Sequence, residues 1–156
     1  MIRLLWISVL VIVLDQITKV MASSQLDYAV PVAVIPMFNF TLLHNTGAAF
    51  SFLSDAGGWQ RWLFTVLALV ISVVLFVWLK RLKPHEKLVG ISLSLILGGA
   101  IGNVIDRILY GYVIDFLDVY YQDWHFPAFN IADSAITMGA AVLIFDSLFS
   151  NKEKTE

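Results

Sequence analysis

Four apolar runs, each about as long as a membrane is thick, constrain this chain more than any other feature. They cover residues 2–22, 62–79, 88–108 and 131–149. A helix needs about 20 mostly apolar residues to cross a bilayer. The mean hydropathy of +0.81 and a charged fraction of only 14% also argue against a soluble globular domain. The sequence therefore predicts an all-α membrane protein, a single integral membrane domain over residues 1–156 with four transmembrane helices.

The first run has some features of a secretory signal peptide, because Arg3 precedes its apolar centre and Ala22 ends it. A cleaved apolar region would not carry Asp15, Gln16 and Lys19, however. We therefore expect a retained first helix rather than a removed leader.

Basic residues indicate the orientation of the helices, because cytoplasmic loops are enriched in lysine and arginine. Seven of the ten basic residues fall on one side of a four-helix arrangement. They are Arg3, Lys80, Arg81, Lys83, Lys87, Lys152 and Lys154. That side is predicted to be cytoplasmic, with both termini inside. Eight of the twelve acidic residues gather at or beyond the opposite, outer ends of the helices.

Two segments are left outside the membrane on the outer side, residues 25–60 and 109–129. The first has an alternating valine pattern that Pro31 and Pro36 interrupt, which predicts short edge strands or hairpins. The second contains eight of the chain's 21 aromatic residues. We expect it to lie along the membrane surface, where tyrosine and tryptophan can keep one polar end in water.

Composition excludes several classes of site. The chain has no cysteine, which removes disulfides, thiolate metal sites and a cysteine nucleophile. A net charge of −2 gives no basic surface for nucleic acid. His44 and His125 could approach Asp133 and hold a metal, but single histidines in outer loops are more often ordinary polar residues. We therefore expect neither a metal nor a cofactor.

Ionisable residues inside spanning segments are costly and usually functional. Asp15 and Lys19 are four residues apart, so they share a helix face and can form an ion pair. Such a pair can equally serve only to make membrane insertion less costly. Asn103, Asp106 and Arg107 share a face of the third helix, where polar contacts between closely packed helices are the simpler explanation.

The fourth helix begins with a polar stripe formed by Asn130, Asp133, Ser134 and Thr137. Asn130 is a good N-cap, and Asp133 would be the acidic third residue of a capping arrangement. Helix capping alone is an equally good explanation of these two residues. Asp115, considered by itself, is best explained as a solvated surface carboxylate.

Together, Asp115 and Asp133 suggest hydrolytic chemistry. Two aspartates within a few ångströms share a proton, so one can act as a base on water and the other as an acid toward a carbonyl oxygen. The first turn of a helix favours negative charge, so Asp133 should ionise first and Asp115 should hold the proton. Spacing places both residues near the outer interface and leaves open whether they meet. A small proton- or ion-coupled transporter and an assembly or chaperone module are the alternatives.

Five short motifs occur in order along the chain: DQITK at 15–19, NTGAAF at 45–50, GNVIDR at 102–107, VIDF at 113–116 and FNIADS at 129–134. In these motifs the chain resembles the bacterial lipoprotein signal peptidases, also called signal peptidase II, over essentially its whole length. The resemblance implies an aspartic endopeptidase of the bacterial inner membrane. It also implies four helices with a small outer β-cradle and a short surface helix.

The resemblance further implies a substrate and a set of site residues. The substrate is a prolipoprotein that already carries diacylglyceryl on a cysteine, and the cut falls just before that cysteine, near the outer face of the membrane. Asp115 and Asp133 are the implied catalytic pair. Nine further residues would shape the site or position the substrate: Asp15, Lys19, Asn45, Gly47, Asn103, Asp106, Arg107, Asn130 and Ala132.

A substrate of this kind suggests how the enzyme works. Its signal segment is an apolar helix, so it can dock sideways from the lipid, and membrane lipids are therefore expected partners. We expect a lid over residues 26–55, in which Gly47, Ala48 and Ala49 allow close approach to the substrate backbone. The protein is expected to act as a monomer and to bind no nucleic acid.

Overall fold

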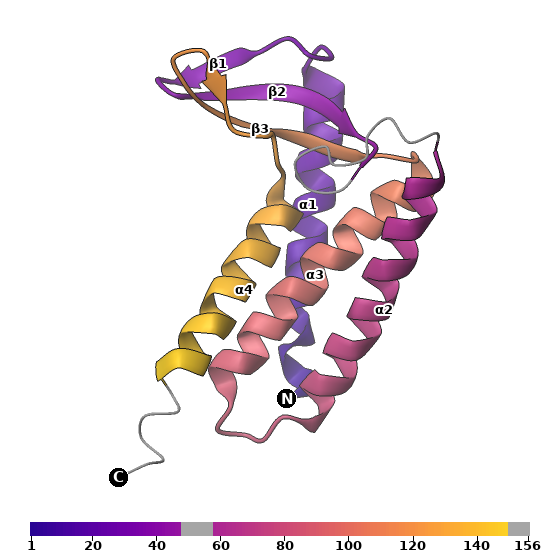
Figure 1. Cartoon of the computed structure of the whole chain (residues 1–156), viewed down its shortest axis with the longest axis vertical. Helices are drawn as coiled ribbons and strands as arrows, with labels where there is room; N and C mark the ends of the chain where they lie inside the picture. The colour runs from indigo at the N-terminus through magenta and orange to yellow at the C-terminus, as the bar shows by residue number, and fades with distance from the viewer. Residues whose placement is uncertain (48–57, 150–156) are drawn as a thin grey trace.

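The computed structural model describes residues 1–47 and 58–149. It contains four helices long and apolar enough to cross a membrane, which confirms the four predicted spans. Figure 1 shows the helices side by side, with a small sheet across the end of the bundle opposite the N-terminus. A short 3-10 turn, η1 (Ile2–Leu4), leads into α1 (Leu5–Gln25). The other helices are α2 (Trp59–Arg81), α3 (Lys87–Leu109) and α4 (Ile131–Phe149).

Three of the four helices extend by one to three residues beyond an end of the apolar run that predicts them, and α4 matches its run. Helix α1 continues to Gln25 rather than ending at residue 22, and α2 begins at Trp59 rather than at residue 62. Polar residues remain helical at such ends when their side chains bond to the free backbone groups. The Ser24 hydroxyl does so by donating to the carbonyl of Met21 at 2.9 Å.

Helix α3 forms the centre of the bundle. Its most apolar stretch is 67% buried, against 17–22% for the corresponding stretches of the other three helices. It contacts α1, α2 and α4, and glycines allow these close approaches. A Cβ atom at Gly98 would lie 2.8 Å from the carbonyl oxygen of Ser8, and one at Gly99 would collide with the carbonyl oxygen of Ala132. The other three helices turn most of their apolar surface outward, as expected for contact with lipid.

The sheet has four antiparallel strands in the order β1-β2-β3-β4. The first outer segment supplies β1 (Val32–Ile35) and β2 (Phe38–Asn45), in agreement with the predicted short strands. The register between β2 and β3 shifts once, between Phe40 and Leu43, and Leu43 then lies directly opposite Asp115.

The second outer segment differs from its predicted course along the membrane surface. It forms β3 (Val113–Tyr121) and β4 (Trp124–His125). The β-branched and aromatic residues of β3 suit a paired strand as well as a membrane interface, so aromatic content alone does not distinguish the two. No separate surface helix occurs in residues 1–47 or 58–149. Residues 48–57, which contain part of the expected lid with Ala48 and Ala49, lie outside the described residues.

A sharp turn and two sets of hydrogen bonds position β3 against the helices. Gly111 has a φ of +90°, a conformation that lets the chain turn sharply from the end of α3 into β3. The carboxylate of Asp106 on α3 then accepts a hydrogen bond from the backbone N–H of Ile114 at 3.0 Å. The carbonyl of Phe129, just before α4, accepts hydrogen bonds from the backbone of β3. As a result, Asp115 is held where the sheet meets the outer ends of α3 and α4.

Candidate active site

Asp115 on β3 lies between two asparagine side chains. Its Oδ1 accepts a hydrogen bond from the amide of Asn130 at 2.7 Å, and its Oδ2 accepts one from the amide of Asn45 at 3.1 Å. The residue is only 2% exposed. The local sequence favoured a solvated surface carboxylate for Asp115, and this interpretation is wrong, because the carboxyl group is buried and held by two hydrogen bonds.

Asn130 connects this carboxyl group to the start of α4. Its side-chain oxygen accepts a hydrogen bond from the backbone N–H of Asp133 at 2.8 Å, which confirms the predicted N-cap. Its amide group donates to Asp115, to the carbonyl of Ile114 and to the side-chain oxygen of Asn103. One asparagine therefore caps the helix that carries Asp133 and orients the carboxyl group of Asp115.

Asp133 receives its hydrogen bond from the third helix. The amide of Asn103 donates to Asp133 Oδ1 at 2.8 Å, while the Asn103 side-chain oxygen accepts from Lys19 Nζ at 3.0 Å. Because Asn103 and Asn130 are themselves in contact at 3.3 Å, the two aspartates are linked through a pair of amides.

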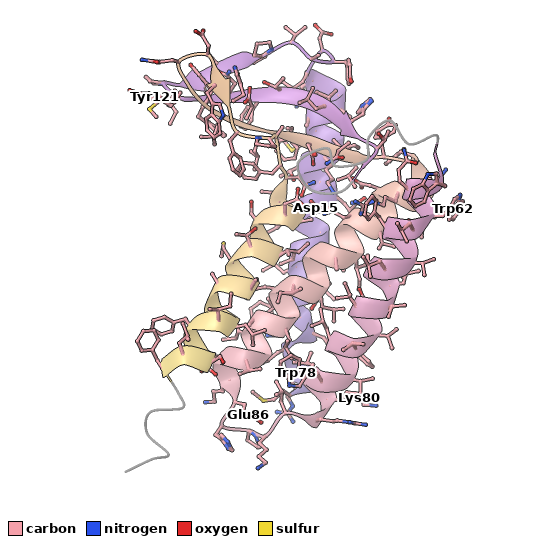
Figure 2. The ribbon with its side chains drawn as sticks, viewed as in Figure 1. Asp15, Trp62, Trp78, Lys80, Glu86 and Tyr121 are labelled. Carbon is pink, nitrogen blue, oxygen red and sulfur yellow. The ribbon has the colours of Figure 1, made fainter. Side chains whose placement is uncertain are left out.

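Lys19 is the centre of a buried ion cluster below the aspartate pair. Its ammonium lies 2.9 Å from Asp15 and 2.8 Å from Asp106, and all three side chains are at most 1% exposed. The predicted pair of Asp15 and Lys19 is thus confirmed, with a second carboxylate added from α3. Figure 2 shows Asp15 partway along α1, just below the sheet.

Ala132 and Gly47 contribute backbone hydrogen bonds to the site. The N–H of Ala132 donates to Asp15 Oδ1 at 2.9 Å, which places the first turn of α4 against α1. The N–H of Gly47 donates to the side-chain oxygen of Asn45 at 3.0 Å, and the carbonyl of Gly47 accepts from Arg107 at 3.3 Å. The Arg107 guanidinium also interacts electrostatically with Asp133 and Asp115.

All eleven residues singled out in the sequence therefore belong to one connected network of hydrogen bonds and ion pairs. It joins α1, α3, α4, β2 and β3 at the end of the bundle that carries the sheet. The sequence could not show that the two aspartates share one network, because they lie on elements whose relative placement depends on how β3 folds back over the helices.

The environment of Asp115 favours its protonated form. Burial raises its pKa most, and the negative charge of Asp133 raises it further. The hydrogen bonds from Asn45 and Asn130 and the charge of Lys19 act in the opposite direction. The net effect is a pKa of about 7, against 3.8 for an ordinary aspartate. A carboxyl group with this pKa can act as an acid or a base near neutral pH.

The histidines considered as metal ligands, His44 and His125, contact residues in or beside the sheet. The ring of His44 stacks on Tyr112, and His125 Nδ1 lies 2.8 Å from Asp118 Oδ1. In the part of the chain that the structure describes, no three histidine, aspartate or glutamate residues are grouped so as to hold a metal ion.

Two residues of the network were missed in the sequence. The amide of Gln16 donates to Asp106 at 2.9 Å and to Asp15 at 3.2 Å, so it is part of the buried cluster. The position of Gln16 beside Asp15 within an apolar run could have indicated this role.

The second residue is Arg61. It donates to the carbonyls of Arg107 and Ile108 at 2.7 and 2.9 Å, and it thereby satisfies carbonyl groups in the last turn of α3. A basic residue next to a helix end is a recognisable pattern, but the sequence does not say which helix it serves.

Comparison with known proteins agrees with this geometry. Residues 7–149 match the family model described as signal peptidase (SPase) II. A lipoprotein signal peptidase of Acinetobacter baumannii is 58% identical over 154 residues, which cover 97% of this chain and 88% of that protein. One from Pseudomonas aeruginosa is 55% identical over 150 residues, which cover 95% of this chain and 89% of that protein.

The fold has a match among solved structures. A bacterial membrane enzyme solved by the in meso method at 2.3 Å superposes with a TM-score of 0.87 and 31% sequence identity, covering 99% of this chain and 92% of that one. The family match covers the first membrane-spanning helix from residue 7 onward, the other three completely, and both aspartates. The chain therefore belongs to the signal peptidase II family of bacterial membrane peptidases.

Proposed function

We propose that this protein removes the signal peptide from prolipoproteins that carry diacylglyceryl on a cysteine, and that it cuts just before this cysteine. The observation that carries the proposal is the placement of two aspartates, Asp115 and Asp133, on a shared pair of asparagine amides at the outer end of the bundle. The names of its relatives supply the class of substrate.

The reaction requires the two aspartates to have opposite roles. Asp133, in the first turn of α4, acts as the base and takes a proton from water while the water oxygen attacks the peptide carbonyl carbon. Asp115, whose raised pKa favours the protonated form, donates its proton to the carbonyl oxygen. When the tetrahedral intermediate collapses, the C–N bond breaks and the proton held by Asp133 passes to the leaving nitrogen. Asp115 recovers its proton from the intermediate, so the charges and protons balance.

The surrounding hydrogen-bond network holds the two carboxyl groups in place for these roles. Asn103 and Asn130 keep the carboxyl groups fixed, and the Lys19 cluster holds Asn103 from below. Arg107 adds positive charge near both carboxyl groups. Preorganised groups of this kind stabilise developing charge without needing to rearrange during the reaction.

The membrane location follows from the same arrangement. We propose one integral membrane domain in the bacterial inner membrane, with both termini in the cytoplasm and the aspartates near the outer face. The apolar outer surfaces of α1, α2 and α4 leave the bundle open to lipid, so a helical signal segment can approach sideways. We propose that the protein acts as a monomer.

A proton- or ion-coupled transporter has no support from these observations. A relay would need ionisable groups at several depths in the membrane. On α4 the next ionisable residue after Asp133 is Asp146, 13 residues or about 20 Å further along the helix. The ionisable residues described above instead gather at the outer end of the bundle.

Cleavage of a defined peptide tests the proposal. The purified protein is mixed with a diacylglyceryl-modified peptide that contains a signal segment, and with the same peptide lacking the lipid, and the products are identified by mass spectrometry. We expect one cut, just before the modified cysteine, and much slower cleavage of the unmodified peptide. An intact lipidated peptide, or a cut at another bond, would contradict the proposal and favour an assembly or chaperone role.

A further inference from the structure

A cavity of about 430 Å³ lies beside the outer sheet, away from the Lys19 cluster. Ligand sites in proteins usually have volumes of about 300–1,000 Å³, so it can hold one or two side chains of a peptide. Apolar residues form most of its wall, together with a carboxylate, a hydroxyl and an imidazole. The lining residues include Thr41, Leu43, Asp118, His125, Phe126 and Ala128.

The polar part of this sheet cavity is built around Asp118. The residue is 5% exposed, and its Oδ2 accepts hydrogen bonds from Thr41 at 2.9 Å and from Asn39 at 3.5 Å. Its Oδ1 lies 2.8 Å from His125 Nδ1. Burial opposes ionisation, but the hydrogen bonds from His125 and Thr41 outweigh it and lower the pKa of Asp118. The carboxylate therefore stays negatively charged at neutral pH.

Asp118 and His125 have hydrogen-bond acceptor positions that are not used within the protein, and these positions suit a ligand that donates hydrogen bonds. A carboxylate accepts about four hydrogen bonds, and three are in use here. A neutral imidazole that donates from Nδ1 to Asp118 also leaves its Nε2 as an acceptor. The His125 side chain is about half exposed, at 51%, so a ligand can reach it. An ammonium or guanidinium group matches such a set of acceptors.

Charge in the surrounding segments points the same way. Residues 26–47 and 110–130 contain four aspartates, Asp27, Asp115, Asp118 and Asp123, and no lysine or arginine. The outer sheet therefore attracts basic groups and repels acidic ones. Anionic lipid headgroups are unfavourable occupants for the same reason.

The sheet cavity adjoins the proposed active site through one shared strand position. Leu43 lines the cavity and lies directly opposite Asp115 in the register of β2 and β3. Asp118 follows Asp115 by three residues on β3, a distance of about 10 Å along a strand. A substrate chain that leaves the aspartates in an extended conformation covers this distance in about three residues.

We propose that the sheet cavity binds the substrate just downstream of the cut and favours a lysine or arginine there, through Asp118, at the second to fourth residue after the modified cysteine. This inference depends on the proposed function, because it assigns the cavity to the same substrate. The signal segment lies upstream of the cut in the membrane, so the chain that leaves toward the outer side is the part that meets the sheet.

A series of lipidated peptides tests this inference. The peptides differ only in carrying Lys, Gln or Glu at one of these downstream positions, and kcat/KM is measured in micelles that contain no aminolipid. At one position we expect Lys to be cleaved about three to ten times faster than Glu, with Gln between them. Equal values of kcat/KM for all three residues at every position would overturn the inference. If no peptide is cleaved at all, the proposed function itself fails.

Two variants and a control assign the preference to the cavity. Asp118→Asn should remove the preference, so that the Lys, Gln and Glu peptides are cleaved with similar kcat/KM, because the amide has nearly the same shape and no charge. Asp123→Asn removes an equivalent charge from the neighbouring turn, outside the cavity, and should keep the preference. Ala128→Leu fills the cavity and should weaken the preference without changing any charge. A preference that survives both Asp118→Asn and Ala128→Leu would overturn the inference, as would a uniform loss of rate on all three peptides.

Discussion

At the scale of single residues, two asparagines connect the chemistry to the scaffold. Asn103 and Asn130 each donate to an aspartate and accept from another part of the network. Neutral amides can do both without adding charge beside two carboxyl groups. An arrangement of this kind links the two aspartates through hydrogen bonds and places no further charge between them.

The raised pKa of Asp115 predicts a pH dependence. Below pH of about 7 the carboxyl group keeps its proton, and above that pH it loses it. The proposed mechanism needs the protonated form, so kcat/KM should fall about tenfold per pH unit on the alkaline side, with an apparent pKa near 7 that belongs to the aspartate pair. The measurement is kcat/KM between pH 5 and 9, with a thermal melt at each pH to exclude unfolding. A rate that stays constant or rises from pH 7 to 9 would contradict this role for Asp115.

The buried ion cluster predicts a large effect on stability. Lys19→Met removes the only cation in contact with both Asp15 and Asp106 among the described residues, and leaves two buried carboxylates without a counter-charge. Breaking such a cluster costs about 3–5 kcal/mol. Thermal unfolding in detergent should therefore show a clear loss of stability. Lys83→Met changes an exposed lysine and is the matched control. An equal effect of the two changes would contradict the assigned role of Lys19.

Sequence spacing predicted only part of this cluster. Helical periodicity correctly paired Asp15 with Lys19, because both residues lie on one helix. It could not add Asp106, since contact between α1 and α3 depends on tertiary packing. For the same reason the local sequence of Asp115 favours a surface position, since its burial depends on β3 folding over the helix ends.

At the scale of elements, the contact between α3 and α4 determines where Asp133 lies. Gly99 on α3 faces the carbonyl of Ala132, the residue just before Asp133. The spans were predictable because apolar length is a local property of the sequence. Strand β3 was not predicted, because its aromatic residues fit a membrane interface equally well and its pairing with β2 is a long-range contact.

Gly99→Ala tests the importance of this helix contact. The added methyl group would collide with the Ala132 carbonyl, so α4 must shift away from α3. Overpacking of this kind costs about 1–3 kcal/mol. We expect a lower unfolding temperature and a lower kcat, because the shift moves Asp133. Ala141→Val enlarges an exposed position on α4 and should have little effect on either quantity. If Gly99→Ala is as active and as stable as the parent protein, the close contact is not needed.

At the scale of the whole molecule, charge is divided between orientation and the site. Most basic residues fall on the side expected to be cytoplasmic, while the acidic residues near the sheet gather at the other end. This division predicts that both termini lie in the cytoplasm and that the sheet lies on the outer side.

The absence of cysteine from the chain makes this orientation easy to test. Asp123→Cys, between β3 and β4, should react with a membrane-impermeant maleimide in intact cells. Lys83→Cys, between α2 and α3, should react only after the inner membrane is made permeable. The predicted topology requires this order of labelling. The reverse order would place the sheet and the aspartates on the cytoplasmic side.

Turnover by aspartate variants tests the central claim most directly. The kcat/KM for one diacylglyceryl-modified peptide is measured for Asp115→Asn, Asp133→Asn and, as a control for charge on the same side of the protein, Asp123→Asn. Loss of an acid or base in the reaction typically costs a factor of about 10²–10⁴. We predict losses of at least about a hundredfold for the first two variants, with unchanged folding and peptide binding, and little change for the third. Retention of more than about a tenth of the activity by either Asp115→Asn or Asp133→Asn would contradict the account.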